Sequence, residues 1–302
     1  MRYQKIIDRR QRRVRLFYSL FLSLLALTLS GWLSPVGAQV RLCGEEISPG
    51  HHGIYRLRGD LECTQDTILH IEKAGSKFDL KDFTATGGGE NDGIRIEADG
   101  VKIVGGTFRN CNTALYVNKH DRCKIEKFTA INSSDIGIRI RGQGNSIVKS
   151  LCINAKDECF RLRVAIVPEP EDITEVPKHI KGNTAKWCTA INGDRGFRFR
   201  GPGHGYNLSA FNSGGEGIQI NEEEIMEDVY VSGVTINHSI IVNSAKHGIE
   251  IEDGADNLIM HNIVLENGDG IDFWDLTDRN EECDGDVWKN NKFDTRNLDC
   301  IN

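Results

Sequence analysis

The chain has 302 residues, of which 39% are hydrophobic and 27% are charged, and it contains 32 glycines and 6 prolines. This mixture excludes a disordered chain, and the glycines lack the three-residue period of collagen. The formal net charge is −7, and it falls to −13 without residues 1–38, which carry seven Lys and Arg and one Asp. An acidic chain repels phosphates, so nucleic acid is excluded as a partner.

The first 38 residues have the order of an export signal. Five arginines between residues 9 and 15 precede the apolar run 16–29, and small residues offer a cleavage site before Gln39. This order is typical of a secretory signal peptide, and the run is too short for a comfortable membrane span. We therefore expect a protein that is secreted or resides in the periplasm or cell envelope, with no stable membrane insertion after cleavage.

All nine cysteines follow the predicted signal peptide. An oxidising compartment favours their pairing. We predict the disulfides Cys43–Cys63 and Cys283–Cys300, because these pairs lie near the two ends of the chain and would fasten its caps. The odd number of cysteines leaves at least one thiol over.

A five-residue phrase that alternates apolar and polar residues recurs eight times between residues 93 and 274. Five of the seven steps between copies are within one residue of 22, and the other two, of 37 and 31 residues, contain insertions. Alternation with period two predicts strands, and the regular step predicts a stack of coils. The copies begin at Gly93, Ala114, Gly137, Cys159, Gly196, Gly217, Gly248 and Gly270.

An asparagine ends the stretch that precedes most copies of the phrase. Asparagine tolerates the left-handed backbone conformation, and its amide both donates and accepts hydrogen bonds. We therefore predict one tight turn per coil, with amides that bond along the stack. The asparagines in this place are Asn110, Asn132, Asn154, Asn192, Asn212, Asn243 and Asn267.

The repeat resembles that of right-handed parallel β-helix proteins of the pectate-lyase-like superfamily, over roughly residues 43–300. The opening Cys43-Gly44-Glu45-Glu46-Ile47, leading to Cys63, is also similar to that of exported bacterial members. The resemblance implies an all-β fold, a single-stranded right-handed parallel β-helix with coils of about 22 residues. We expect it to occupy residues 39–302 as one domain.

Strand alternation places charged residues on the outside of this helix. If the apolar residues of each phrase point inward, coils three to five display six arginines in two columns of three, and coils seven and eight display carboxylates beside them. Like charges on neighbouring strands repel, so this block of six arginines needs an anion to neutralise it. The two columns are Arg139, Arg161 and Arg198, and Arg141, Arg163 and Arg200.

Two sources of that anion remain open. One is an anionic ligand such as a polyuronate, because guanidinium groups match carboxylates with paired hydrogen bonds. The other is internal, because the acidic insertion between Pro168 and Pro177 leaves directly after Arg163 and could fold back onto the block. A second insertion, from Glu222 to Asp228, would wall the same side of the face.

Pectate-type lyases abstract the proton next to a uronate carboxylate with an Arg or Lys base, and many use Ca²⁺. The resemblance implies these roles for the outer face. The expected catalytic residues are Arg161, Arg198, His247 and Asp272. The expected substrate-binding residues are Arg139, Arg141, Arg163, Arg200, Gln219, Glu250 and Trp274. The expected Ca²⁺ ligands are Glu252, Asp253 and Asp256.

The segment from Asp269 to Asp275 is similar to a motif of mannuronan C5-epimerases, in which Asp272 matches the catalytic Asp. Phe273 and Trp274 replace the Pro and the catalytic His of that motif. The function expected is recognition of an acidic polysaccharide, as a uronate lyase or C5-epimerase. The alternative is a non-enzymatic envelope or adhesive binding module, because the fold alone does not fix the function.

Overall fold

The structure is a computed structural model that describes residues 39–64, 66–165, 180–226, 229–268, 272–280, 283 and 285–301. The predicted signal peptide and the loop between Pro168 and Pro177 lie outside these residues. Within the described part, no helix is long and apolar enough to cross a membrane. The single helix found there is a 3-10 turn, η1 (His51–Gly53), and the other regular elements are strands.

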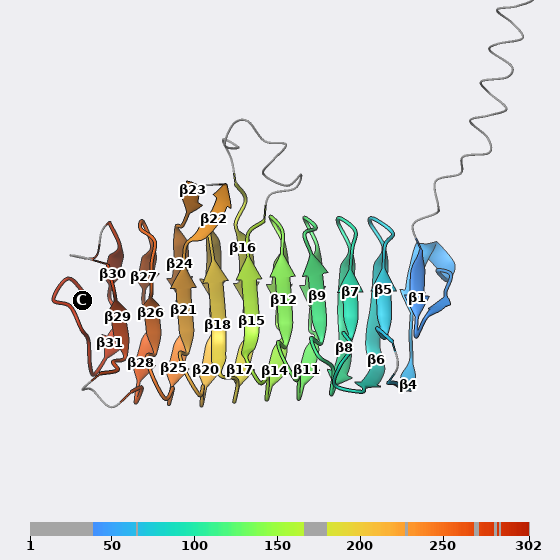
Figure 1. Ribbon diagram of the computed structural model, residues 1–302, viewed down its shortest axis with the longest axis horizontal. Helices are drawn as coiled ribbons and strands as arrows, with labels where there is room; N and C mark the ends of the chain where they lie inside the picture. The colour runs from blue at the N-terminus through green and yellow to red at the C-terminus, as the bar shows by residue number, and fades with distance from the viewer. Residues whose placement is uncertain are drawn as a thin grey trace, which may run out of the picture. The chain divides into compact units, whose positions relative to one another are not determined.

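The strands stack into a parallel β-helix, as the repeat predicts (Figure 1). Each coil contributes one strand to an eleven-stranded sheet, and the strands from β5 to β29 pair in parallel. In sheet order, these strands are β2 (Glu45–Glu46), β1 (Val40–Leu42), β5 (Leu69–Ile71), β7 (Ile94–Ile96), β9 (Leu115–Asn118), β12 (Ile138–Arg141), β15 (Glu158–Arg163), β18 (Arg195–Arg200), β21 (Ile218–Asn221), β26 (Ile249–Ile251) and β29 (Leu276–Asp278).

The remaining faces of the helix come from two further columns of parallel strands. The long strands β6 (Lys77–Gly87) and β8 (Lys102–Arg109) pair with members of both columns. One column holds β3 (Ile54–Arg56), β10 (Lys124–Glu126), β13 (Ser146–Val148), β16 (Asn183–Lys186), β19 (Gly203–Tyr206), β24 (Val234–Asn237), β27 (Leu258–Met260) and β30 (Val287–Lys289). The other holds β4 (Gly59–Cys63), β11 (Thr129–Ile131), β14 (Leu151–Ile153), β17 (Thr189–Ile191), β20 (Ser209–Phe211), β25 (Ile240–Val242), β28 (Ile263–Leu265) and β31 (Lys292–Phe293).

The core is a set of apolar stacks that run from coil to coil. Ile138, Phe160 and Phe197 are register partners on β12, β15 and β18, and none of them is exposed. The rings of Phe160 and Phe197 stack with centroids 4.7 Å apart. Burial of such a side chain contributes about 1.5–3 kcal/mol, so contact between coils supplies most of the stability.

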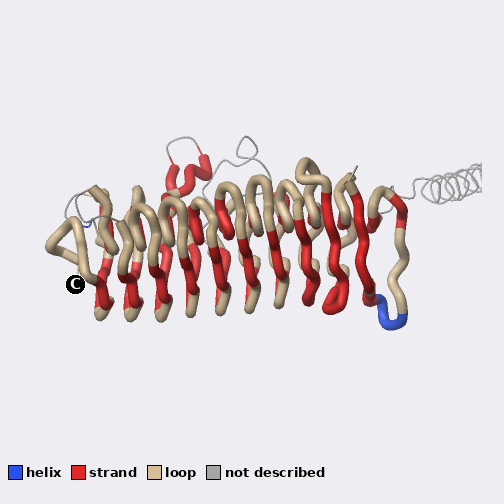
Figure 2. Tube along the Cα trace, turned by 90° about the horizontal axis from the view of Figure 1, so that it is seen from below, coloured by secondary structure: helices blue, strands red, loops and turns tan. Residues whose placement is uncertain are grey.

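Loops and turns join the strands of successive coils (Figure 2), and the asparagine turns among them form the predicted ladder. The Asn132 amide donates to Asn110 Oδ1 at 3.3 Å, and the same bond recurs at each step as far as Asn243. These six residues all have left-handed φ angles. The prediction is wrong for Asn267, whose buried amide turns inward to Asp275, while Glu266 takes the left-handed position.

The eighth phrase lies partly outside the described residues, and its described residues 272–274 are not in a strand. β29 instead begins at Leu276, which pairs with Ile249, and Thr277 lies beside Glu250. The buried carboxylate of Asp275 holds this register, because its oxygens accept from the backbone N–H groups of residues 267, 294 and 295. Alternation alone could not place the strand, since both segments alternate apolar and polar residues.

A short segment extends the eleven-stranded sheet beyond the regular coils at both ends. At the start, β1 pairs antiparallel with β5 and with β2, so the two-residue strand β2 is the last strand at this end. At the other end, Arg296 forms a parallel bridge with Leu276 on β29. The predicted disulfide Cys283–Cys300 is present and ties this C-terminal segment.

The predicted disulfide Cys43–Cys63 is wrong for this structure, in which both residues are thiols. The two side chains are hydrogen-bonding neighbours, and burial together with that contact raises the pKa of Cys43 to about 12.

Candidate functional site

The six predicted arginines lie in register on the outer face of the eleven-stranded sheet. Arg139 pairs with Arg161 and Arg161 with Arg198, and the column continues through Gln219 to Glu250. The second column runs in the same way through Arg141, Arg163, Arg200 and Asn221. The alternation of each phrase therefore placed both columns correctly from β12 to β26.

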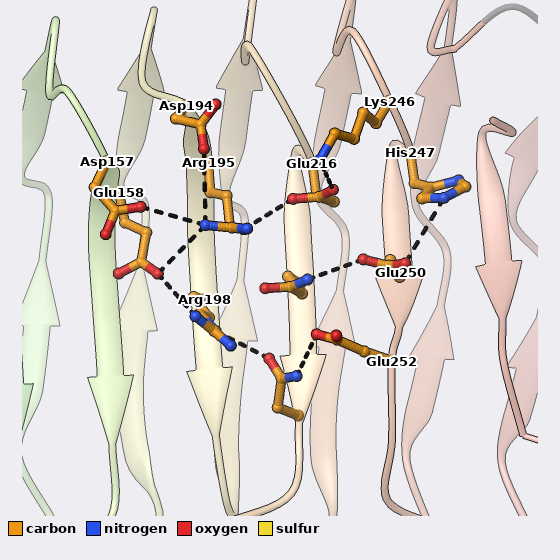
Figure 3. Close-up of polar contacts among 12 residues, drawn as sticks. Asp157, Glu158, Asp194, Arg195, Arg198, Glu216, Lys246, His247, Glu250 and Glu252 are labelled. Atoms are coloured by element: carbon orange, nitrogen blue, oxygen red, sulfur yellow. Dashed lines mark hydrogen bonds and ion pairs between the residues drawn. The ribbon is translucent and has the colours of Figure 1, made fainter.

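A buried glutamate at the start of β15 neutralises part of the block (Figure 3). Glu158 has no exposed surface, and it accepts a hydrogen bond from Arg161 Nε. Its Oε1 also lies 3.3 Å from Arg198 Nη1 and 3.9 Å from Arg195 Nη1. Asp157 adds a second carboxylate to Arg161 and Arg195, at 2.9 and 3.2 Å. Two predicted catalytic arginines are thus engaged within the protein.

A second buried carboxylate reaches the block from the second insertion. Glu223, which is 2% exposed, begins β22 (Glu223–Met226), and β22 pairs with β23 (Val229–Val231) as a hairpin (Figure 1). Its Oε1 accepts from Arg163 Nε at 2.7 Å, and its Oε2 lies 3.1 Å from Arg200 Nε. This hairpin therefore supplies part of the negative charge that neutralises the arginines. The clamp predicted between Pro168 and Pro177 lies outside the described residues.

The arginines of β12 have no ion pair with any carboxylate of the described residues. The Arg139 guanidinium lies over the ring of Tyr116, 4.9 Å from its centroid. Arg141 Nε is buried and makes no hydrogen bond within the described part of the chain. A buried N–H without a partner costs about 1–3 kcal/mol.

The surroundings shift the pKa values of Arg161 and Arg200 in opposite directions. Burial alone would lower the pKa of Arg161, but its hydrogen bond to Glu158 and that residue's charge raise it. Burial lowers the pKa of Arg200, and the charges of Arg163 and Arg198 lower it further against the opposing effect of Glu223. The pKa is thus raised for Arg161, which the sequence assigned a catalytic role, and lowered for Arg200, which it assigned to substrate binding.

The structure brings His247, Glu250 and Gln219 together. His247 Nδ1 accepts from the backbone N–H of Trp274 at 3.2 Å, so the neutral ring carries its proton on Nε2. Nε2 lies 3.7 Å from Glu250 Oε1, and Glu250 Oε2 accepts from Gln219 Nε2 at 3.0 Å. Arg279 Nε donates to Glu250 Oε1 at 2.6 Å. The group is an ordered network in which no more than 4% of Gln219, His247 or Glu250 is exposed.

Asp272 and Trp274 do not take the predicted places in the outer columns. Thr277 stands beside Glu250 where Asp272 was expected, because β29 begins at Leu276. Asp272 is exposed, and Trp274 is partly buried with its ring stacked on His247 at a centroid distance of 6.0 Å. Trp274 therefore supports the histidine and does not extend the outer column.

The predicted Ca²⁺ ligands do not converge. Glu252 Oε2 accepts from the Asn221 amide at 2.6 Å, and Asp253 Oδ1 accepts from the backbone N–H of Glu222 at the same distance. Asp256 does not join them in a set of convergent ligand atoms among the described residues. These three residues, as placed, do not fit a Ca²⁺ site.

A third column, one residue before each phrase, was missed by the sequence analysis. It contains Glu158, Arg195, Glu216 and His247, and Glu158 and Arg195 are register partners. Arg195 Nε donates to Glu216 Oε2 at 2.8 Å, and Lys246 Nζ lies 3.2 Å from Glu216 Oε1 (Figure 3). The alternating charge at this fixed offset was the signal that could have revealed the column.

His247 predicts a dependence of stability on pH. Burial lowers the pKa of His247, and this effect outweighs the charge of Glu250. The unfolded chain then binds the proton more readily, so stability is complete above the unfolded pKa of about 6.5 and falls as the pH decreases below it. We expect urea unfolding between pH 7.5 and pH 5 to show a smaller decline for H247Q. The control is H204Q, at an exposed histidine. If stability falls as much in H247Q as in H204Q and in the unchanged protein, the prediction is wrong.

No family model matches the chain, and no curated protein matches it in sequence. The structure is similar to pectate lyase Pel9A, with a TM-score of 0.45, 14% identity, and coverage of 83% of this chain and 68% of that chain. It is similar to a double mutant of the tailspike protein of E. coli bacteriophage HK620 in complex with a pentasaccharide, with a TM-score of 0.47 and 12% identity. That match covers 80% of this chain and 51% of the tailspike. A GH87 alpha-1,3-glucanase catalytic unit from Streptomyces thermodiastaticus matches with a TM-score of 0.45 and 11% identity, over 83% of this chain and 64% of that chain.

Proposed function

We propose that the outer face of the eleven-stranded sheet binds an acidic polysaccharide and removes the proton next to the carboxylate of a uronate unit. The observation that carries this proposal is the pair Arg139 and Arg141, which form no ion pair with a carboxylate of the described residues, while Arg141 Nε has no hydrogen-bond partner there. A carboxylate can accept two parallel hydrogen bonds from a guanidinium. A uronate would therefore supply both the missing charge and the missing acceptor for Arg141 Nε.

The register of the arginines suits a chain that lies along the helix axis. Coils stack about 4.8 Å apart, so a polymer in this direction passes over Arg141, Arg163 and Arg200 in turn. We assign proton abstraction to Arg200, which follows Arg141 and Arg163 in register, and its lowered pKa favours the neutral guanidine that the step requires. The proton passes from C5 to the guanidine nitrogen, and the electron pair moves toward the carboxylate, where the other arginines stabilise the charge.

Two products can follow from that common step. Expulsion of the glycosidic oxygen at C4 gives an unsaturated uronate, which is a lyase reaction. Return of a proton to the opposite face of C5 gives the epimer. The predicted export is consistent with either reaction, since a secreted or envelope protein would encounter such polymers outside the cell.

A binding module without catalysis is the second candidate. It is favoured by the burial of Glu158 and Glu250, which have exposed fractions of 0% and 2% and therefore serve the fold in the state described. Such a module would bind the same anionic chain through Arg139 and Arg141 without breaking a C–H bond.

Hydrogen exchange at C5 separates the two candidates. The full chain is incubated in deuterated water with polygalacturonate, alginate or a glycosaminoglycan, and the sugars are analysed by mass spectrometry and ultraviolet absorbance. We expect deuterium at C5 or an unsaturated product with at least one polymer, and neither with R200Q. Binding without either change would exclude the catalytic proposal and retain the module.

The binding proposal makes its own prediction for Arg139 and Arg141. Each charge-assisted hydrogen bond contributes about 1.5–3 kcal/mol, so we expect the double variant R139Q/R141Q to bind the polymer at least about tenfold more weakly. Calorimetric titration measures this, and R109Q, at an exposed position on another face, is the matched control. Equal affinity of the double variant and the control would overturn the assignment of the site.

A further inference from the structure

A separate group of metal-ligating side chains lies on the same sheet near its first coils. His70 is on β5, and Glu72 and Glu97 directly follow β5 and β7. One ligand atom from each of the three residues lies within 4.8 Å of the others. His70 Nε2 is 3.0 Å from Glu97 Oε2 and 4.0 Å from Glu72 Oε1. The three side chains are partly exposed, so an ion from solution can reach them.

Neighbouring donors fix the orientation of Glu97. Its Oε1 accepts from Arg95 Nε at 2.9 Å and from the Asn118 amide at 3.2 Å, which leaves Oε2 facing His70. One oxygen of the Glu97 carboxylate is thus oriented as partners around metal sites orient a ligand.

We propose that His70, Glu72 and Glu97 bind a divalent transition-metal ion, of which Zn²⁺ is the best fit. Tetrahedral Zn²⁺ with ligands at 2.0–2.1 Å requires ligand atoms about 3.3 Å apart, and the observed separations of 3.0 and 4.0 Å bracket that value. The imidazole nitrogen disfavours Ca²⁺ and Mg²⁺, which prefer oxygen ligands throughout.

The site has room for a further ligand on the metal. A hollow of about 370 Å³ borders it, lined by Glu72, Glu97, Asp99, His120 and Asp121 among others. Three protein ligands beside an open position are typical of zinc that binds water or a substrate group. His120 and Asp99 form their own pair in this hollow, with Nδ1 3.0 Å from Oδ1. That pair supplies a matched control, because it is near the site but outside the ligand set.

Calorimetric titration of the full chain with Zn²⁺ tests the proposal. We expect one Zn²⁺ per chain and weaker binding of Ca²⁺. H70Q and E72Q should each weaken Zn²⁺ binding at least about tenfold, and H120Q should leave it unchanged. The visible absorption of bound Co²⁺ gives a second readout, which H70Q should shift because it removes the nitrogen ligand.

Two results would overturn the proposal. One is the absence of Zn²⁺ binding by the folded chain. The other is binding that survives both H70Q and E72Q, which would place the ion elsewhere, for example at Cys43 and Cys63. A strong cobalt–thiolate absorption band would identify that location. Circular dichroism of each variant establishes that its coils remain folded during the titration.

Discussion

Replacing Glu158 by Gln should lower the free energy of unfolding by about 3–5 kcal/mol. Glu158 is completely buried, and its carboxylate contacts Arg161, Arg195 and Arg198. Removal of one charge from a buried ion-pair network leaves the opposite charges without compensation, and such losses are large. Urea unfolding of E158Q beside the unchanged protein measures the difference at neutral pH.

Asp157 supplies the control for this prediction. It contacts two of the same arginines, but 35% of its side chain is exposed, so D157N should cost no more than about 1 kcal/mol. At a temperature where E158Q remains folded, we also expect it to bind anionic polysaccharide more tightly, because Arg198 loses its carboxylate partner and Arg161 and Arg195 each lose one of theirs. Equal stability of E158Q and D157N would show that the carboxylate does not hold the block together.

The second large effect is expected for Gly248→Ala, which should destabilise the fold by about 3 kcal/mol. A Cβ at this position would lie 2.2 Å from Val264 Cγ1 and 2.6 Å from the carbonyl oxygen of Asp275. The carbonyl belongs to the next coil and accepts the backbone hydrogen bond of Ile249, so it cannot move without breaking that contact. Overpacking of this kind typically costs about 1–3 kcal/mol, and the rigid neighbour places this case at the upper end.

Thermal and urea unfolding of G248A test this prediction, and Gly214→Ala is the matched control. A Cβ at Gly214 would come no closer than 3.4 Å to another atom, which is ordinary contact. G214A should therefore remain within about 0.5 kcal/mol of the unchanged protein. Ala114 and Cys159 begin their phrases with a side chain, so the penalty at Gly248 arises from its own neighbours. Equal stability of the two variants would contradict the steric argument.

The fold could be predicted because the chain repeats one local pattern. Alternating residues decide which side chains enter the core, and the step of about 22 residues decides which ones are stacked. These two facts were sufficient to place Arg139, Arg161 and Arg198 in one column before any coordinates. The asparagine ladder was predictable for the same reason, since Asn192 and its counterparts occupy one place in successive coils.

The partners of the arginines could not be predicted from that pattern. Glu223 reaches Arg163 across 60 residues because β22 and β23 fold back as a hairpin, and no periodicity describes an insertion. The position of the last strand was missed because Asp275 sets it through hydrogen bonds to segments on either side. Regular coils thus follow from sequence, whereas the exceptions depend on contacts between distant segments.

The short segments at the two ends of the sheet also bear on how molecules meet one another in solution. A strand edge with unpaired backbone groups is a template on which a second molecule can continue the sheet, and a stack of coils has two such edges. Here β2 lies beside β1, and Arg296 bridges to Leu276 on β29, so these segments take places that a second molecule would otherwise occupy. The Cys283–Cys300 bond ties the C-terminal segment in its place.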